Sequence, residues 1–349
     1  MRAGCRGVLV GALMLGCCWC AGTQAVAPAT PLEQRRGAEN TYLDFPDWYP
    51  AHSAAEYAKY ISADRPSSDF PYWGQVAQLW GGYGQAFKAT LRADFQPLTH
   101  AHLLTRASLA TASGAIASAY EVTIGRLSEL TRTQGPTSEE RYAAKVAQDY
   151  ADFVRTRPWY EFDFGARLQN LWRDTGCNGP DLLRKWERKY ALSSVYATKA
   201  IFAWFAGKLA GVNPVATPQR TAVVVDRWVD RIAGNWPEMQ RVRTFANGGE
   251  LVLLPRFDAF KTLAIAIARS GANFAEVAGN GPDALILVSV VVPRDWHPDS
   301  AGSTTLFEQT VLTLPEQKRV VLTVPVHELA QTLRELDGMQ ITVEQVYDY

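Results

Sequence analysis

The sequence predicts an α+β protein in which an all-α N-terminal domain precedes an antiparallel-rich α+β domain. Residues 42–212 show helical periodicity and contain an internal duplication, whereas residues 220–349 alternate short apolar runs with amphipathic segments. Between them, Asn213-Pro214 and Thr217-Pro218 end the helical pattern, because proline cannot continue a helix. A chain of 349 residues is long enough for two domains, each with its own core.

The first 25 residues have the layout of a secretory signal. Arg2 and Arg6 precede an apolar run over residues 8–15, and small residues follow. An uncleaved anchor is the alternative, since residues 7–32 carry no charge, although the truly apolar part is shorter than the ~20 residues of a spanning helix. We therefore expect export to the periplasm or cell envelope, with residues 26–41 as an Ala-, Pro- and Thr-rich linker.

Cysteine usage agrees with a signal that is removed. Four of the five cysteines lie in this region, and their loss would leave Cys177 alone, with no internal disulfide. Leu15-Gly16-Cys17 also resembles a lipoprotein cleavage box, so lipidation stays open beside cleavage and retention. The net charge is zero, with 35 basic and 35 acidic residues, which argues against nucleic acid as the main partner.

The helical half contains one motif twice. RPSSDFPYWGQVAQLW covers residues 65–80 and RPWYEFDFGARLQNLW covers residues 157–172. Related segments with Tyr-Ala, an aromatic residue and a branched aliphatic residue precede both copies, at 56–61 and 149–154. The prolines can open a turn, and Asp69 and Glu161 are placed to favour the start of the next helix. We interpret the motif as the hinge and core staple of a duplicated helical unit.

A site is expected between the copies rather than within one. One alternative is an enzyme or small-ligand binder whose pocket there is lined by Tyr72, Trp73, Tyr83, Tyr160 and Phe164. Trp80 and Trp172 complete the aromatic set that a pocket or a partner interface would use. Glu121 and Lys199 are lone charges in the two small or apolar helix segments, so we predict that they pair across the helix interface.

The two long helical segments differ in character. Residues 107–120 are uncharged, and ten of the fourteen are Ala, Ser or Gly, which predicts a tightly packed soluble helix. The segment after Pro180 starts with charges and becomes aromatic up to Phe205, so it could dock on a bilayer surface. Lys199 and Lys208 argue against spanning, which leaves a monotopic membrane-associated protein as a further alternative.

The final third predicts strands and two helices. Strands are expected at 250–254, 274–278, 284–292 and 339–346, a hairpin at 306–314 and 318–324, and an edge strand at 220–225. Helices are expected at 257–270 and 327–336. This order suggests an antiparallel α+β sandwich of ferredoxin-like type.

No motif predicts catalysis. His100 and His102 point to different helix faces, and His327-Glu328 lacks the second histidine of a zinc protease. The loop with Asp295, His297 and Ser300 offers an acid, a base and a hydroxyl, but no oriented nucleophile. We expect no metal and no cofactor. The leading interpretation is a non-catalytic envelope protein that contacts a protein partner or a surface.

Overall fold

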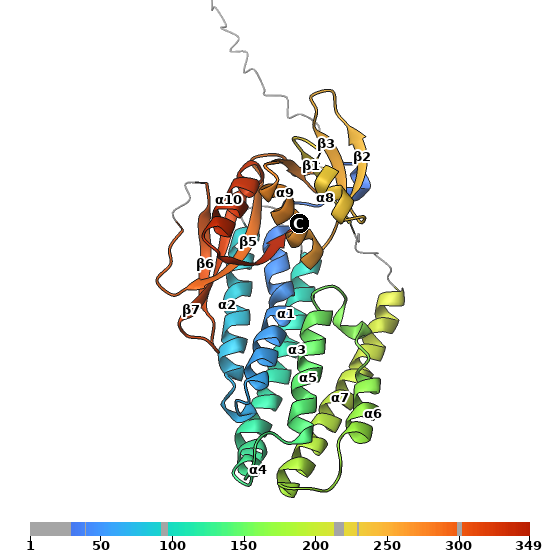
Figure 1. Cartoon of the computed structure of the whole chain (residues 1–349), viewed down its shortest axis with the longest axis vertical. Coiled ribbons are helices and arrows are strands. Elements are labelled where there is room, and N and C mark those ends of the chain that lie inside the picture. The colour runs from blue at the N-terminus through green and yellow to red at the C-terminus, as the bar shows by residue number, and fades with distance from the viewer. Residues whose placement is uncertain (1–28, 39, 92–96, 213–219, 229, 299–301) are drawn as a thin grey trace, which may run out of the picture.

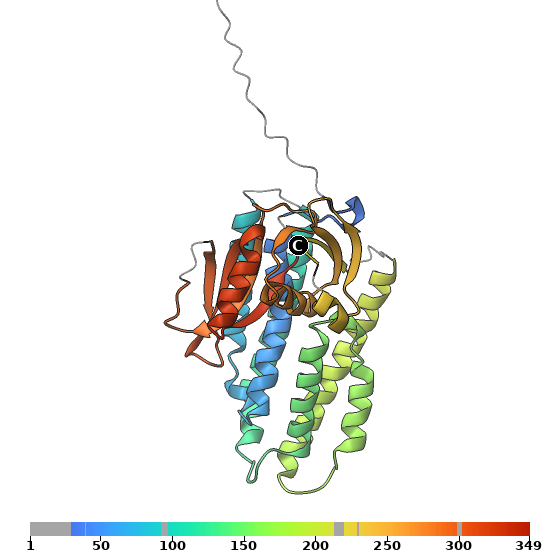
Figure 2. The ribbon, with the colours of Figure 1, turned by 45° about the horizontal axis from the view of Figure 1, so that its top comes forward.

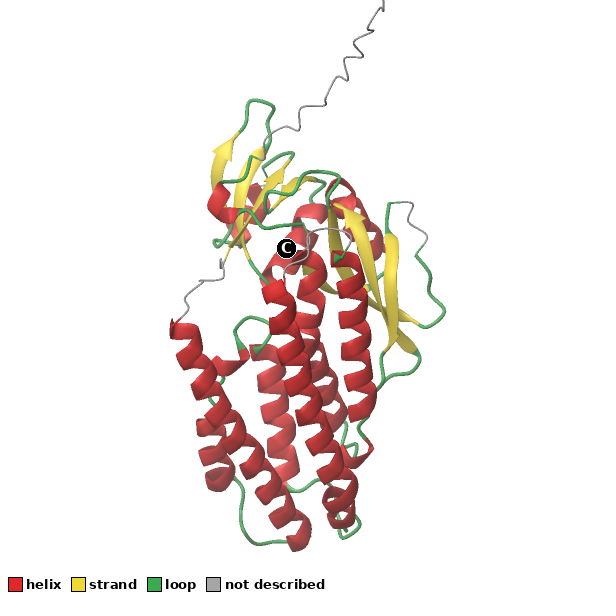
Figure 3. Cartoon of the chain, turned by 180° about the vertical axis from the view of Figure 1, so that it is seen from behind, coloured by secondary structure: helices red, strands yellow, loops and turns green. Residues whose placement is uncertain are grey.

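The computed structural model describes residues 29–38, 40–91, 97–212, 220–228, 230–298 and 302–349. It confirms the α+β class: a bundle of helices carries two antiparallel sheets at one end (Figures 1 and 3). The predicted signal at 1–25 and the prolines of the domain boundary lie outside the described residues.

The helical half contains two sets of three long helices joined by short 3₁₀ turns and a π-helical segment. In chain order its elements are η1 (Leu32–Gln34), α1 (Asn40–Ser62), η2 (Ser67–Asp69), α2 (Tyr72–Thr90), α3 (Pro97–Tyr120), the π-helix η3 (Glu121–Gly125), α4 (Arg126–Glu129), α5 (Ser138–Phe153), η4 (Trp159–Glu161), α6 (Phe164–Asp174) and α7 (Leu182–Val212). The first set is α1–α3, the second is α5–α7, and α1 packs along α5.

The duplication is visible in the hinge geometry. Pro66 and Pro158 have φ, ψ of −59°, 129° and −59°, 137°, and each precedes a single 3₁₀ turn. Behind these hinges the ring centroids of Tyr57 and Phe70 lie 5.0 Å apart, and those of Tyr150 and Phe162 lie 5.2 Å apart. Both pairs are edge-to-face, the favoured arrangement of aromatic rings. The staple that the sequence predicted therefore exists in both copies.

The tryptophan that ends each motif makes an equivalent hydrogen bond in the two repeats. The indole N–H of Trp80 donates to Thr111 Oγ1 at 2.9 Å, and that of Trp172 donates to Ser193 Oγ at 3.0 Å. The predicted capping by the motif's acids is wrong. Asp69 pairs instead with Arg126 at 3.0 Å. The residue that caps α6 is Asp163, whose carboxylate accepts from the Ala166 backbone N–H.

The C-terminal half forms two four-stranded sheets, each entirely antiparallel. The first unit is β1 (Arg220–Val225), α8 (Asp230–Asn235), β2 (Gln240–Thr244), β3 (Glu250–Pro255), α9 (Asp258–Arg269) and β4 (Phe274–Val277), with strand order β2-β3-β1-β4. The second is β5 (Leu285–Pro293), β6 (Thr304–Thr310), β7 (Gln317–Pro325), α10 (Val326–Gly338) and β8 (Thr342–Tyr347), with order β6-β7-β5-β8.

Both sheets follow one topology. The first unit runs βαββαβ, the order of a ferredoxin-like domain. The second repeats the strand order, and a connection at 294–303 stands where the first has α8. The sequence predicted one such domain and missed α8 and β2. It also placed β1 at an edge, whereas β1 lies between β3 and β4 because both of those strands pair with it.

One apolar core joins the two sheets. Helices α9 and α10 contact each other, α10 contacts β4 of the first sheet, and α9 contacts β8 of the second. Figure 2 shows the two sheets side by side above the bundle. Phe260, Leu263 and Leu329 are fully buried between these layers. The α+β half is therefore a single packed unit built from two similar sheets.

A buried ion network joins the second sheet to the bundle. Arg319 of β7 is 1% exposed, and its Nη2 donates to Glu56 of α1 at 3.0 Å and to Glu344 of β8 at 2.8 Å. Burial alone would raise the pKa of Glu344, but the charges of His52 and Arg319 hold it well below its usual range. These bonds fix α1 against the sheet.

The segment before α1 also lies on the α+β half. The backbone N–H groups of Ala29 and Thr30 donate to the Glu276 carboxylate at 2.8 and 2.9 Å, and Arg36 pairs with Asp348. The described part of the predicted linker is thus held in place from residue 29 onward.

Candidate functional site

Helix α7 turns its charged residues inward. Arg184, Lys185, Arg188 and Lys189 share one helix face, because residues one, four and five positions apart lie close together around the axis. None of the four is more than 7% exposed. The interior of the helical half is therefore charged where a bundle core is normally apolar.

Glutamates from several parts of the bundle neutralise these cations. Arg188 binds both oxygens of Glu121 at 3.0 and 3.1 Å and also bonds Glu187 of its own helix. Burial alone would lower the pKa of Arg188, but the hydrogen bond to Glu187 and the charge of Glu121 raise it above its ordinary value. Glu139 is fully buried and lies 3.4 Å from Lys185 and 3.5 Å from Lys189.

The π-helix η3 is hydrogen-bonded into this network. Arg184 Nη1 donates to the Gly125 carbonyl at 2.9 Å, which satisfies a backbone acceptor in the π-turn. A Cβ on Gly125 would lie 2.5 Å from Glu121 Oε2 and 3.3 Å from Arg188 Nη2. A side chain at position 125 would therefore displace the ends of Glu121 and Arg188, whose ion pair bonds η3 to α7.

Tyrosines surround the ion pair. Tyr57 and Tyr72 hydrogen-bond to each other beside Glu121 and Arg188, and burial raises the pKa of both phenols. The Tyr120 hydroxyl donates to Glu187 at 2.9 Å. Each of these charged residues has a partner of opposite sign. The arrangement braces the two repeats and does not resemble a poised acid–base pair.

The outer faces of the same helices are apolar. Between residues 182 and 207 of α7, and between 107 and 125 of α3 and η3, every exposed residue is uncharged. We name as the apolar surface the sixteen exposed large apolar side chains of these segments and of the flanking residues 104 and 127–130, which adjoin the exposed Arg106 and Arg126: Leu104, Leu109, Ile116, Val122, Ile124, Leu127, Leu130, Leu182, Leu183, Trp186, Tyr190, Val195, Ile201, Phe202, Trp204 and Phe205. Their exposed fractions run from 41% at Leu104 to 78% at Leu130.

The other side of the bundle is polar. Lys59 of α1 and Arg141, Lys145 and Asp152 of α5 are exposed there. A groove of about 520 Å³ runs between α1 and α5, lined by Ala55, Lys59, Ser62, Ala63, Gln148 and Arg155. The helical half therefore has one charged face and one apolar face.

The predicted aromatic residues do not gather in one pocket. Tyr72 is bonded to Tyr57 in the interior, Phe164 is 2% exposed in the core of the second repeat, and Trp73 is 59% exposed. Tyr83 is buried against His100 between α2 and α3, and Tyr160 is half-buried in η4. Trp80 and Trp172 are partly exposed and bonded within their own repeats.

The predicted pair of Glu121 and Lys199 is wrong. Glu121 is bound by Arg188 of α7. Lys199 lies eleven residues beyond Arg188 in α7, about 16 Å away along the axis of that helix. The Lys199 ammonium instead lies 5.0 Å from the ring centroid of Tyr150 and 5.3 Å from that of Phe164. Burial lowers the pKa of this amine.

The small helix segment packs as predicted. Gly114 of α3 lies against α2, and a Cβ there would approach Val76 to 3.1 Å. The close approach that small residues permit is thus used inside the first repeat. In the part of the chain that the structure describes, no helix has both the length and the apolarity to cross a bilayer.

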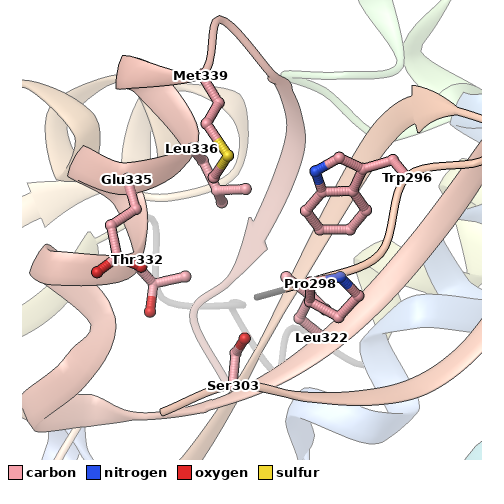
Figure 4. Close-up of a pocket in the computed structure, with 8 residues that line it drawn as sticks. All are labelled: Trp296, Pro298, Ser303, Leu322, Thr332, Glu335, Leu336 and Met339. Atoms are coloured by element: carbon pink, nitrogen blue, oxygen red, sulfur yellow. The ribbon is translucent and has the colours of Figure 1, made fainter. Parts of the chain in front are cut away.

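The candidate catalytic groups are not assembled into a site. His100 is buried against Tyr83 and Thr90, and His327 bonds the Pro282 carbonyl. The loop after Asp295 borders a pocket of about 10 Å³ between α10 and β7, which has room for at most about one water molecule (Figure 4). No group of three metal-ligating side chains occurs among the residues of the described ranges.

Comparison with known proteins identifies no relative: no protein-family model, characterised protein or solved structure matches this chain.

Proposed function

We propose that this protein is an exported, non-catalytic docking protein of the cell envelope that binds a partner through the apolar surface of α3, η3, α4 and α7. The observation that carries this proposal is the reversed arrangement of α7. The four cations at its N-terminal end are buried and paired with glutamates, and its large apolar side chains face solvent.

The size of the surface supports docking. With roughly 100 Å² exposed for each side chain, the sixteen residues present on the order of 1,500 Å². The largest apolar patch of an ordinary monomer covers ~300–600 Å². Exposed apolar area costs about 25 cal/mol per Å², so covering the surface releases a large free energy.

The rest of the molecule supports a passive role. The α+β half has an apolar core and a pocket of only about 10 Å³, and the buried cations of α7 from 184 to 189 are paired with glutamates. The fold thus presents a rigid apolar face on a soluble body.

A photo-crosslinking amino acid at position 116 or 202 tests the proposal in intact cells that export the full chain. Both positions should give crosslinked products. The same label at Val242, which is 51% exposed on β2, serves as the matched control and should give few. Equal yields at all three positions would remove the proposal.

A lipid surface is the second candidate, favoured by the aromatic residues Trp186, Tyr190, Trp204 and Phe205 on α7. Flotation of the exported protein with vesicles of phosphatidylethanolamine and phosphatidylglycerol tests it. Binding that an aspartate at position 202 abolishes would favour lipid over a protein partner.

A further inference from the structure

We infer that the apolar surface is covered by a second copy of this chain in a two-fold symmetric dimer. This inference rests on the docking function proposed above and names the partner. The partner is argued from the area of the surface, from its charge and from the shape of its two helices.

The area is that of a stable homodimer. An interface of standard size buries ~800 Å² on each partner, and obligate homodimers bury more and are more apolar. The apolar surface offers on the order of 1,500 Å² on each copy, almost all of it carbon. A transient partner would leave much of this area in water.

The middle of the surface carries no exposed charge. Exposed residues are uncharged from 107 to 125 and from 182 to 207, and the exposed Arg106, Arg126 and Lys208 border these segments. Two copies can therefore bring the uncharged segments together without repulsion between like charges. In a dimer, the charged face formed by α1 and α5 would remain in solvent on both copies.

The exposed face of α3 has large and small side chains in an order that allows a second helix to pack on it. Small exposed residues, Ser108, Ala112 and Ala119, alternate with the large Leu109 and Ile116. Such alternation forms ridges and grooves that interdigitate with those of a second helix. Because a two-fold axis brings the same patch of both copies together, one self-complementary helix is sufficient.

The buried network makes the surface rigid before it is covered. Arg184 and Arg188 bond α7 to η3 through the Gly125 carbonyl and Glu121. The two sides of the surface are thus fixed relative to each other, and association loses little conformational entropy.

The test measures the mass of the exported protein, purified from cells that express the full chain, by sedimentation equilibrium between about 1 and about 100 µM. We expect twice the chain mass. Ile116→Asp and Phe202→Asp should each weaken the dimer at least about 100-fold, because each buries a charge without a partner. Val242→Asp, at a residue that is 51% exposed on β2, should leave it unchanged.

The outcomes separate this inference from the proposed function. A monomer at every concentration overturns the dimer; if that monomer floats with vesicles and Phe202→Asp abolishes flotation, docking stands with lipid as the partner. A dimer that survives both aspartate variants shows that another surface associates, which overturns the inference. Crosslinks from position 116 in cells then decide the docking function separately.

Discussion

The α+β half packs an apolar core between its sheets and helices, whereas α7 in the helical half turns charged residues inward and large apolar residues outward. In the α+β half, Leu254, Leu263 and Val288 are fully buried, and its exposed large apolar residues in the described ranges are Val242, Leu285 and Met339. In the helical half, Arg184 and Lys189 are buried, while Phe202 is 55% exposed.

This difference indicates that the interiors of the two halves make different contributions to stability and to specificity. An apolar core supplies stability by itself, so the α+β half needs no partner. A buried ion network contributes specificity more than stability, because desolvation offsets much of the attraction. The helical half therefore obtains a fixed shape from its interior, and its apolar side chains remain available on the outside.

The largest expected effect on stability is that of a substitution at Arg188. Arg188→Met would leave Glu121 buried without its cation and Glu187 with Arg184 alone, and we expect a loss of ~3–5 kcal/mol in the free energy of unfolding. Urea denaturation measures the loss. Arg173→Met, which removes a solvent-exposed pair with Asp174, is the control and should change little. A similar small change for both variants would mean that the network does not hold the bundle.

Alkaline pH should weaken the helical half next. Burial raises the pKa of Tyr57, Tyr72 and Tyr196 above the ordinary 10.0, and raises the pKa of Tyr150 to about 12. A raised phenol pKa means that the folded state prefers the neutral form. The stability that it contributes is present below pH 10 and is lost as pH rises through the folded pKa.

At pH ~11, Tyr150 alone should cost about 1 kcal/mol, and the other helical tyrosines add to it. We therefore expect the helical signal in circular dichroism to fall together with the rise in phenolate absorbance. Helices that stay intact after all fourteen tyrosines have ionised would contradict the buried environment of these rings.

Local features of the fold could be predicted from the sequence. The hinges at Pro66 and Pro158 depend on a fixed φ and on nearby rings, so the quoted motifs contain all that determines them. Strand β2 could not be predicted, because all five of its residues are exposed and its basic residues break the apolar pattern. The inner position of β1 is decided by pairing with β3 and β4, which residues 220–225 do not reveal.

The sequence predicted a site between the copies, whereas the apolar surface lies on the outer faces of α3, η3, α4 and α7. The charges of α7 looked like a solvated helix end, because their partners are distant in sequence: Glu121 is 67 residues from Arg188, and Glu140 is 44 residues from Arg184. One signal was available. Leu183, Trp186 and Tyr190 interleave with those charges, and helical geometry puts the two sets on different faces. Which face is buried depends on the rest of the bundle.

A sharper test of the duplication compares equivalent rings. Phe70 and Phe162 are each 5% exposed and contact their following aromatic residue with centroids 4.9 Å apart. Phe70→Leu and Phe162→Leu should therefore cost the same, about 1–2 kcal/mol each, in chemical denaturation. A difference above ~1 kcal/mol would show that the two repeats do not share the bundle's stability equally.

The smallest expected effect lies at Lys199, where the helical half buries a charge without an acid. Its ammonium contacts the rings of Tyr150 and Phe164, and the described residues offer it no ion pair. Ring contacts with a cation are worth ~0.5–2 kcal/mol, which is close to what desolvation takes away. Lys199→Met should therefore leave stability unchanged or raise it by up to ~1 kcal/mol.

The matched control is Lys189→Met. Lys189 also lies over a ring, that of Trp172, but its ammonium bonds the Thr175 carbonyl at 2.8 Å and faces the buried Glu139. Its removal should destabilise, because Glu139 would lose one of its two cations in a dry interior. Thermal unfolding of both variants decides between the two environments. If Lys199→Met were the more damaging variant, the ring cage would be the stronger stabiliser, and charge pairing would not explain why α7 keeps its cations inside.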